Sequence, residues 1–143
     1  MLFSRSTEYA VRAMTCLARQ GPGKLTGARE ISEVEKIPMP FLWKILHLLT
    51  KRKLVRSFKG IHGGYELACR ANEIPLNLIV NATDGAQFRE SCVLGLPECD
   101  NENPCPLHDQ WKGIRGDMAR MLDETSLADL ARVTQARRNA KKY

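Results

Sequence analysis

Three cysteines with a histidine close behind them are the residues of this chain best suited to bind a metal. Cys92, Cys99 and Cys105 lie within fourteen residues, and His108 comes three positions after the last of them. Thiolates that converge from one loop can hold an iron–sulfur cluster, in which histidine is an accepted ligand. The same donors also suit tetrahedral zinc, although zinc sites usually contain two cysteines separated by two to four residues. The spacing favours a cluster and leaves zinc open.

The fourth ligand is a separate question. His108 stands at the start of a predicted long helix and is one candidate. Glu8, in the first turn of the first predicted helix, is the alternative, and it could reach the site from a partner subunit. An acidic residue is also common in a first helical turn, where it offsets the helix dipole.

The five cysteines are an odd number in a chain that we expect to be cytosolic, so a disulfide framework is a poor explanation for them. Cys16 and Cys69 are expected to be ordinary buried or half-buried thiols. Cys105 and His108 could form a thiol–imidazole pair, but no orienting residue accompanies them. We therefore predict that the protein is not an enzyme.

The elements that must position these residues follow from the hydrophobic spacing. Helices are predicted at 7–20, 27–35 (with Thr26 as its N-cap) and 40–51, followed by short strands at 54–58 and 65–68. A short helix at 76–83, an irregular loop and a long helix at 107–123 follow. A last helix is capped by Ser126, with Asp129 three residues on as the partner in a capping box. The predicted fold is mostly α with a small β-hairpin wing: a winged helix-turn-helix domain (1–85), a cysteine-containing cluster-binding loop (86–106), and a dimerisation helix with a C-terminal helix and tail (107–143).

The charge is concentrated in the winged domain. Residues 1–70 contain 13 Lys/Arg and 5 Asp/Glu, whereas the rest of the chain is slightly acidic, which suggests that the first half meets a polyanion. A helical projection of the third helix separates an apolar face, predicted to be buried, from a face with Trp43, Lys44, His47 and Lys51. The apolar face consists of Leu42, Ile45, Leu46 and Leu49. The third helix of a winged domain enters the major groove of DNA. The candidate DNA contacts are Thr26, Trp43, Lys44, His47, Lys51, Arg56, Lys59 and His62.

An apolar seam runs along the predicted long helix. It is formed by Leu107, Trp111, Ile114, Met118 and Met121, which are spaced by four and three residues in turn. The seam could pack on its own domain, but its position after the cysteine loop suits a homodimer interface. A two-fold dimer would bind a near-palindromic site on double-stranded DNA.

No stretch of the sequence has the roughly 18 apolar residues of a membrane span, and charged residues interrupt the first 25 positions. We expect a soluble, cytoplasmic protein without a membrane partner.

Several segments resemble one known family. Residues 57–68 (SFKGIHGGYELA) are similar to the wing signature of the IscR/NsrR regulators, the Rrf-two type. Residues 9–14 (YAVRAM), 103–108 (NPCPLH) and 125–130 (TSLADL) also resemble that family, so the similarity extends over essentially the whole chain. The first cysteine spacing is one residue longer than the even spacing associated with IscR and NsrR, and Trp43 stands where an IscR-like helix has a polar residue.

The resemblance implies a homodimeric bacterial regulator, in most cases a repressor, with a 2Fe–2S or 4Fe–4S cluster that senses nitric oxide, redox state, or the supply of iron or clusters. It implies ligand roles for Cys92, Cys99 and Cys105. The fourth ligand would be His108 in the IscR-like manner or Glu8 of the other subunit in the NsrR-like manner. Trp43, Lys44 and Lys59 would read bases or enter a groove. The alternative function is a zinc-stabilised or cluster-free DNA-binding regulator without redox sensing.

Overall fold

Six α-helices and one two-stranded hairpin make up most of the fold, which the computed structural model describes for residues 3–97 and 99–140. In chain order the elements are α1 (Arg5–Gln20), α2 (Ala28–Glu35), α3 (Met39–Lys51), β1 (Val55–Phe58), β2 (Gly64–Leu67), the 3-10 turn η1 (Ala71–Glu73), α4 (Leu76–Thr83), the 3-10 turn η2 (Gln87–Arg89), α5 (His108–Glu124) and α6 (Leu127–Ala140). The prediction of a mostly helical fold with a small β-hairpin wing is confirmed. No helix within the described ranges is long and apolar enough to span a membrane.

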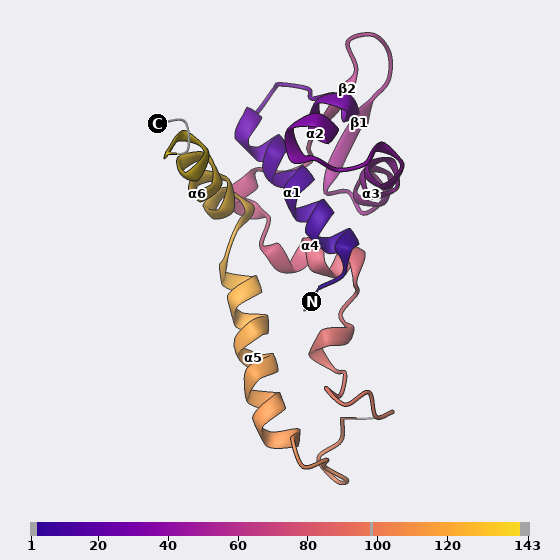
Figure 1. Cartoon of the computed structure of the whole chain (residues 1–143), viewed down its shortest axis with the longest axis vertical. Coiled ribbons are helices and arrows are strands. Elements are labelled where there is room, and N and C mark those ends of the chain that lie inside the picture. The colour runs from indigo at the N-terminus through magenta and orange to yellow at the C-terminus, as the bar shows by residue number, and fades with distance from the viewer. Residues whose placement is uncertain (1–2, 98, 141–143) are drawn as a thin grey trace.

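The elements form a head and an arm (Figure 1). The head contains α1 to α4, the hairpin and α6, whereas the arm consists of α5 and the cysteine-containing segment beside it. After α5 the chain returns to the head, where α6 packs along α1. Leu127, at the start of α6, is fully buried in the same core as α1 and α3.

The core of the head forms between α1 and the inner face of α3. Leu42, Leu46 and Leu49 recur at helical spacing on that face and are fully buried against Met14 of α1. Burial of each such side chain contributes roughly 1.5–3 kcal/mol relative to exposure. This packing fixes α3 to the head and leaves its opposite face free.

The hairpin pairs Val55 with Leu67 and Phe58 with Gly64 in an antiparallel register. Two backbone hydrogen bonds join it to the segment before α2: the Thr26 N–H donates to the Tyr65 carbonyl (3.0 Å) and the Tyr65 N–H donates to the Thr26 carbonyl (2.8 Å). A Cβ atom at Gly63 would overlap the Phe58 carbonyl oxygen, so the closing turn of the hairpin requires glycine there.

This backbone pairing corrects the expected role of Thr26. Its side chain is fully buried under the hairpin, so it offers no group to DNA. It is not the N-cap of α2 either, because α2 is preceded by Gly27, which makes no side-chain capping bond.

The start of α6 has the predicted capping box. The Asp129 N–H donates to the Ser126 hydroxyl oxygen (3.2 Å), and the Asp129 carboxylate accepts from the Ser126 N–H (3.0 Å). The hydrogen bond from the Ser126 N–H lowers the pKa of Asp129. The connection between arm and head is thereby fixed at the point where α6 begins.

Candidate nucleic-acid interface and cysteine loop

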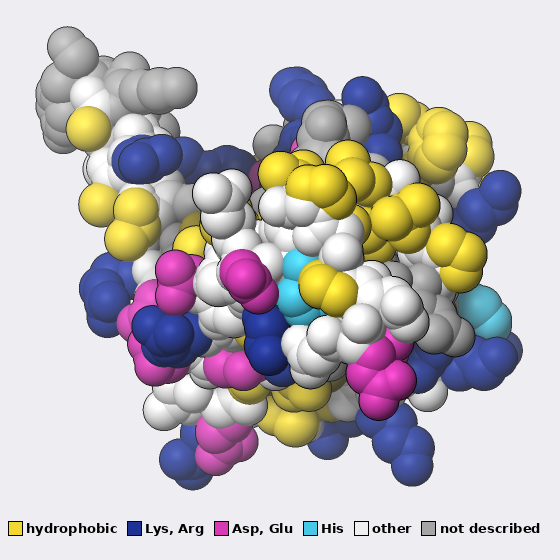
Figure 2. All heavy atoms as spheres, turned by 90° about the horizontal axis from the view of Figure 1, so that it is seen from below, with side chains coloured by type: hydrophobic (Ala, Val, Ile, Leu, Met, Phe, Trp, Pro, Cys, Tyr) yellow, Lys and Arg dark blue, Asp and Glu magenta, His cyan; other side chains and the backbone are white. Residues whose placement is uncertain are grey.

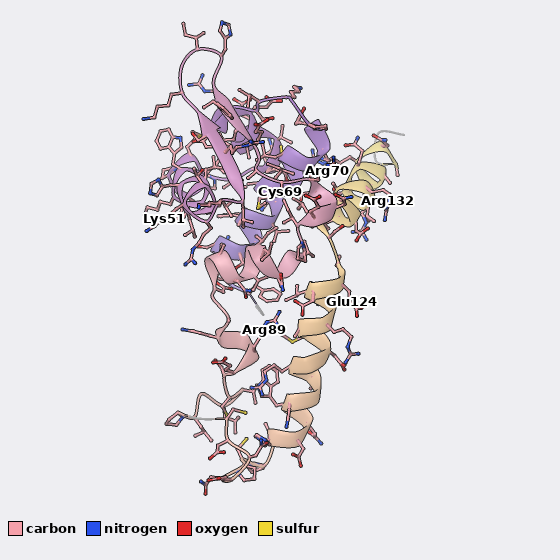
Figure 3. All side chains as sticks on the ribbon, turned by 180° about the vertical axis from the view of Figure 1, so that it is seen from behind. Lys51, Cys69, Arg70, Arg89, Glu124 and Arg132 are labelled. Atoms are coloured by element: carbon pink, nitrogen blue, oxygen red, sulfur yellow. The ribbon has the colours of Figure 1, made fainter. Side chains whose placement is uncertain are left out.

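The outer face of α3 carries the predicted DNA-contacting side chains at the surface. Trp43 is 58% exposed, and Lys44, His47 and Lys51 are exposed as well. Lys51 lies at the edge of the head and points away from it (Figure 3). Lysine and indole side chains on a helix that fits the major groove can contact phosphate, guanine acceptors and a thymine methyl group. The face therefore has the chemistry of a DNA-reading surface.

A short turn sets α3 at its angle to α2. Lys36 has a left-handed backbone (φ 55°) and ends α2. Ile37 is then buried, and Pro38 directly precedes α3. Proline fixes its own backbone angle at a value compatible with the entry to a helix. The sequence between the two helices thus determines how the outer face of α3 is presented.

The wing adds a second charged surface beside α3. Lys59 and His62 are exposed near its tip, which projects from the head (Figure 1). The Arg56 guanidinium is different, because it lies 3.4 Å from the Glu66 carboxylate across the hairpin. Glu66 therefore neutralises part of the Arg56 charge in the protein without DNA.

The donors of the cysteine loop form two pairs. The Cys99 sulfur lies 3.5 Å from Nδ1 of His108, whose Nε2 lies 2.8 Å from Oδ1 of Asn101. His108 is 4% exposed, so the first turn of α5 holds the imidazole inside the loop. The second pair is Cys92 with Cys105.

Cys92 is buried and receives backbone hydrogen bonds. The N–H groups of Leu94 and Leu96 lower the pKa of its thiol, and a hydrogen bond from the Cys105 side chain has the same effect. Thiolate, rather than thiol, is the form that binds metal. Within residues 3–97 and 99–140, however, no group of three or more His, Cys, Asp or Glu residues is placed to hold a metal ion.

The other candidate residues lie apart from this loop. Glu8 is exposed on the first turn of α1, in the head. Cys16 is buried, as expected, and burial raises the pKa of its thiol. Cys69 is exposed, which corrects the expectation of a buried or half-buried thiol, because it follows the last paired residue of β2.

The comparisons with known proteins agree with this arrangement. The profile of the Rrf2 family, described as iron-dependent transcriptional regulator, matches residues 3–133. The chain belongs to the Rrf2 family. It is accordingly a DNA-binding transcriptional regulator and not an enzyme.

Relatives of this Rrf2 regulator include an HTH-type transcriptional regulator of Aquifex aeolicus, which is 34% identical over 94% of each chain. The HTH-type transcriptional regulator IscR of Aliivibrio salmonicida is 30% identical over 91% of this chain and 77% of that protein. Among solved structures, CymR, the global cysteine regulator of B. subtilis, has a TM-score of 0.79 at 25% identity, over 92% of this chain and 96% of that one.

Two side chains of α5 attach the cysteine loop of this Rrf2 regulator to the arm. Nε1 of Trp111 donates to the Ser91 carbonyl oxygen (2.8 Å), and a guanidinium nitrogen of Arg115 lies 3.3 Å from the same oxygen. Ser91 directly precedes Cys92, so this clamp acts on the backbone beside a candidate ligand. Sequence reasoning placed Trp111 on the seam and missed Arg115, because neither spacing nor composition indicates a contact with residue 91.

The other residues of the seam differ in exposure. Leu107, Ile114 and Met121, seven residues apart, are exposed, whereas Met118 is half-buried. The loop adds the exposed side chains of Val93, Leu94 and Leu96. Viewed from the loop end, the surface shows hydrophobic side chains gathered on one side (Figure 2). Such an apolar surface on a charged protein is typical of an interaction site.

Proposed function

We propose that this Rrf2 regulator is a homodimeric repressor whose binding to a near-palindromic operator is controlled by an iron–sulfur cluster, of the 2Fe–2S or 4Fe–4S type. The observation that carries the proposal is the 3.5 Å contact of the Cys99 sulfur with the buried His108 imidazole, beside a loop that also contains Cys92 and Cys105 and is joined to α5 by Trp111. The effector would be nitric oxide, redox state, or the supply of iron or clusters.

The donor set suits a cluster in kind. Three thiols and an imidazole are cluster ligands, and the N–H groups around Cys92 favour its thiolate. Cys92, Cys99 and Cys105 would hold the cluster, with His108 as the fourth ligand and Glu8 of the other subunit as the alternative. A bound cluster would supply iron that changes oxidation state and reacts with nitric oxide. The two donor pairs would have to approach one another, and an irregular loop can accommodate that change more easily than a helix.

Contacts with α5 would couple a change in the cysteine loop to the position of the DNA-binding head. Trp111 and Arg115 hold the residue before Cys92 against α5, and the Asp123 carboxylate near the end of α5 binds Arg89 of η2 (2.7 Å). A rearranged loop would therefore act on α5 at both ends. If α5 joins two subunits, that action changes the separation of the two heads, and with it the fit to an operator.

The dimer contact is proposed on α5. Leu107, Ile114 and Met121 are exposed at heptad spacing, and a helix with such an exposed apolar stripe gains free energy when a second copy covers it. A two-fold axis there would present two α3 helices to one face of DNA. Trp43, Lys44, His47 and Lys51 would then contact the major groove, and Arg56, Lys59 and His62 the flanking backbone.

The test is an anaerobic preparation examined by visible absorption and circular dichroism, with iron and sulfide assays. We expect absorption bands near 400 nm or beyond, as iron–sulfur clusters show, and different operator affinities for loaded and cluster-free protein. Cys92→Ser should lose the bands, whereas Cys69→Ser is the matched control, because Cys69 is exposed and lies outside the loop. Protein that stays colourless after reconstitution with iron and sulfide, or equal operator affinity of the two forms, would refute the cluster proposal.

The second candidate is a zinc-stabilised or cluster-free regulator without redox sensing. Its cluster-free form is favoured because no group of three or more His, Cys, Asp or Glu residues within residues 3–97 and 99–140 is placed to hold a metal ion. The fold is also that of CymR, the global cysteine regulator of B. subtilis. A zinc-loaded protein would be colourless, so the same spectrum distinguishes the two candidates.

A further inference from the structure

A polar cleft of about 520 Å³ opens between α1, α2 and α6. These three helices lie in the head, whereas the cysteine loop lies at the far end of the arm (Figure 1). Arg19 and Arg138 line it, together with the amide side chains of Gln20, Gln135 and Asn139. Among the described residues, no carboxylate lines this cleft. Its size falls within the roughly 300–1,000 Å³ of small-molecule sites.

One buried carboxylate, that of Glu35, binds both arginines of the cleft. Glu35, the last residue of α2, is 7% exposed and binds Arg19 and Arg138 through the same oxygen, the latter at 2.7 Å. Arg12 lies 3.9 Å from its other oxygen. An adjoining cavity of about 320 Å³ shares Arg19 and Arg138 and adds Arg137.

Positive charge is therefore in excess at this point. Three guanidinium groups carry about fifteen N–H donors, whereas one carboxylate offers about four acceptor positions. Arg19 is itself only 9% exposed, so water reaches its guanidinium poorly. Among the described residues it also donates to the Thr134 hydroxyl, at 3.3 Å. A second anion would find preorganised donors here, because the planar fork of arginine matches a carboxylate or phosphate in two parallel hydrogen bonds.

We infer that the cleft between α1, α2 and α6 binds a small organic anion, whose carboxylate or phosphate group is held by Arg19 and Arg138. The amides of Gln20, Gln135 and Asn139 supply hydrogen bonds for the polar remainder of that molecule. The site contains none of the proposed cluster ligands and none of the proposed DNA contacts. Anion binding here can therefore be tested independently of the proposed function.

The experiment measures thermal unfolding of the full chain in sodium phosphate and in sodium malonate, each compared with sodium chloride at the same ionic strength and pH. Binding at an anion concentration ten times the Kd should raise Tm by about 4–5 °C for a chain of this size. A shift with malonate alone identifies a carboxylate ligand, and a shift with phosphate alone a phosphate ligand. Isothermal titration with the active anion should show a saturable site.

Two variants of Arg138 in α6 test whether the rise in Tm comes from anion binding in this cleft. Arg138→Gln should abolish the shift, and Arg138→Lys, which keeps the charge and loses the fork, should reduce it. Arg132→Gln is the matched control on the same helix, since Arg132 is 75% exposed and pairs with Asp129 outside the cleft, and it should keep the full shift. The inference is wrong if neither anion exceeds chloride, if Arg138→Gln responds like the wild type, or if the control loses the shift equally.

Discussion

Removal of the Glu35 carboxylate should destabilise the head more than removal of any exposed acid. In Glu35→Ala, the buried Arg19 guanidinium loses its carboxylate partner and, within the part of the chain that the structure describes, keeps the hydrogen bond to Thr134. Breaking a buried ion pair from one side costs about 3–5 kcal/mol, because the remaining charge stays desolvated. Arg12 and Arg138 are each more than 40% exposed and can turn to water, so we place the loss near the low end, at about 3 kcal/mol.

The assay is thermal or urea unfolding followed by circular dichroism at one protein concentration. For a chain of this length about 1 kcal/mol corresponds to roughly 3 °C, so Tm should fall by about 10 °C. The matched control is Glu66→Ala, which breaks the Arg56–Glu66 pair, in which the arginine side chain is 59% exposed and the glutamate side chain 21% exposed. Because water reaches this pair more easily than the Arg19–Glu35 pair, its loss should cost about 1 kcal/mol or less.

A double replacement tests the physical reason. In Glu35→Met combined with Arg19→Met both buried charges are gone, so much of the lost stability should return, as it does when a buried pair is replaced by apolar groups. The reasoning is refuted if Glu35→Ala costs no more than Glu66→Ala, or if the double variant is as unstable as the single one.

Four further outcomes are expected. Lys51→Ala should flatten the dependence of log K on log salt for duplex DNA by about 0.9, and Arg56→Ala by less, because Glu66 already neutralises part of its charge; equal changes in fluorescence anisotropy titrations would contradict this. Gly63→Ala should open the wing and weaken DNA binding with little loss of helical signal, since the added Cβ meets backbone. Trp111→Phe should speed amide exchange in the cysteine loop by roughly the factor of ten that a hydrogen bond of about 1.4 kcal/mol provides; unchanged exchange would remove the clamp from the argument. The folded-state pKa of Asp129 is lowered, so its stabilising effect is present above its unfolded pKa and is lost as the pH falls through the folded value; Asp129→Asn should therefore show a smaller stability loss on acidification.

Local spacing was enough to predict most elements. The four-residue and three-residue spacing of Leu42, Ile45, Leu46 and Leu49 predicted which face of α3 is buried. Ser126 with Asp129 predicted the start of α6, since a capping box joins residues three apart. The charge of the first half and the wing signature indicated a DNA-binding family, which the comparison confirms.

The site could be predicted only in part. The types and spacing of Cys92, Cys99, Cys105 and His108 named the candidate donors, but not that they would lie in two pairs. Thr26 was expected at a helix terminus and at DNA, but its backbone pairs with Tyr65, thirty-nine positions away. Hydrogen bonds between distant segments override local preferences, and periodicity carries no information about them.

The sequence by itself determined the helices, the wing, the charged outer face of α3 and the candidate donors of the loop, because each depends on residues within a few positions of one another. Only the tertiary structure decided that Trp111 turns to the Ser91 carbonyl and that Glu35 gathers arginines from α1 and α6. Glu35 and Arg138 are 103 positions apart, and only the return of α6 to α1 brings them together. The burial of that carboxylate, and the cleft beside it, are consequences of packing.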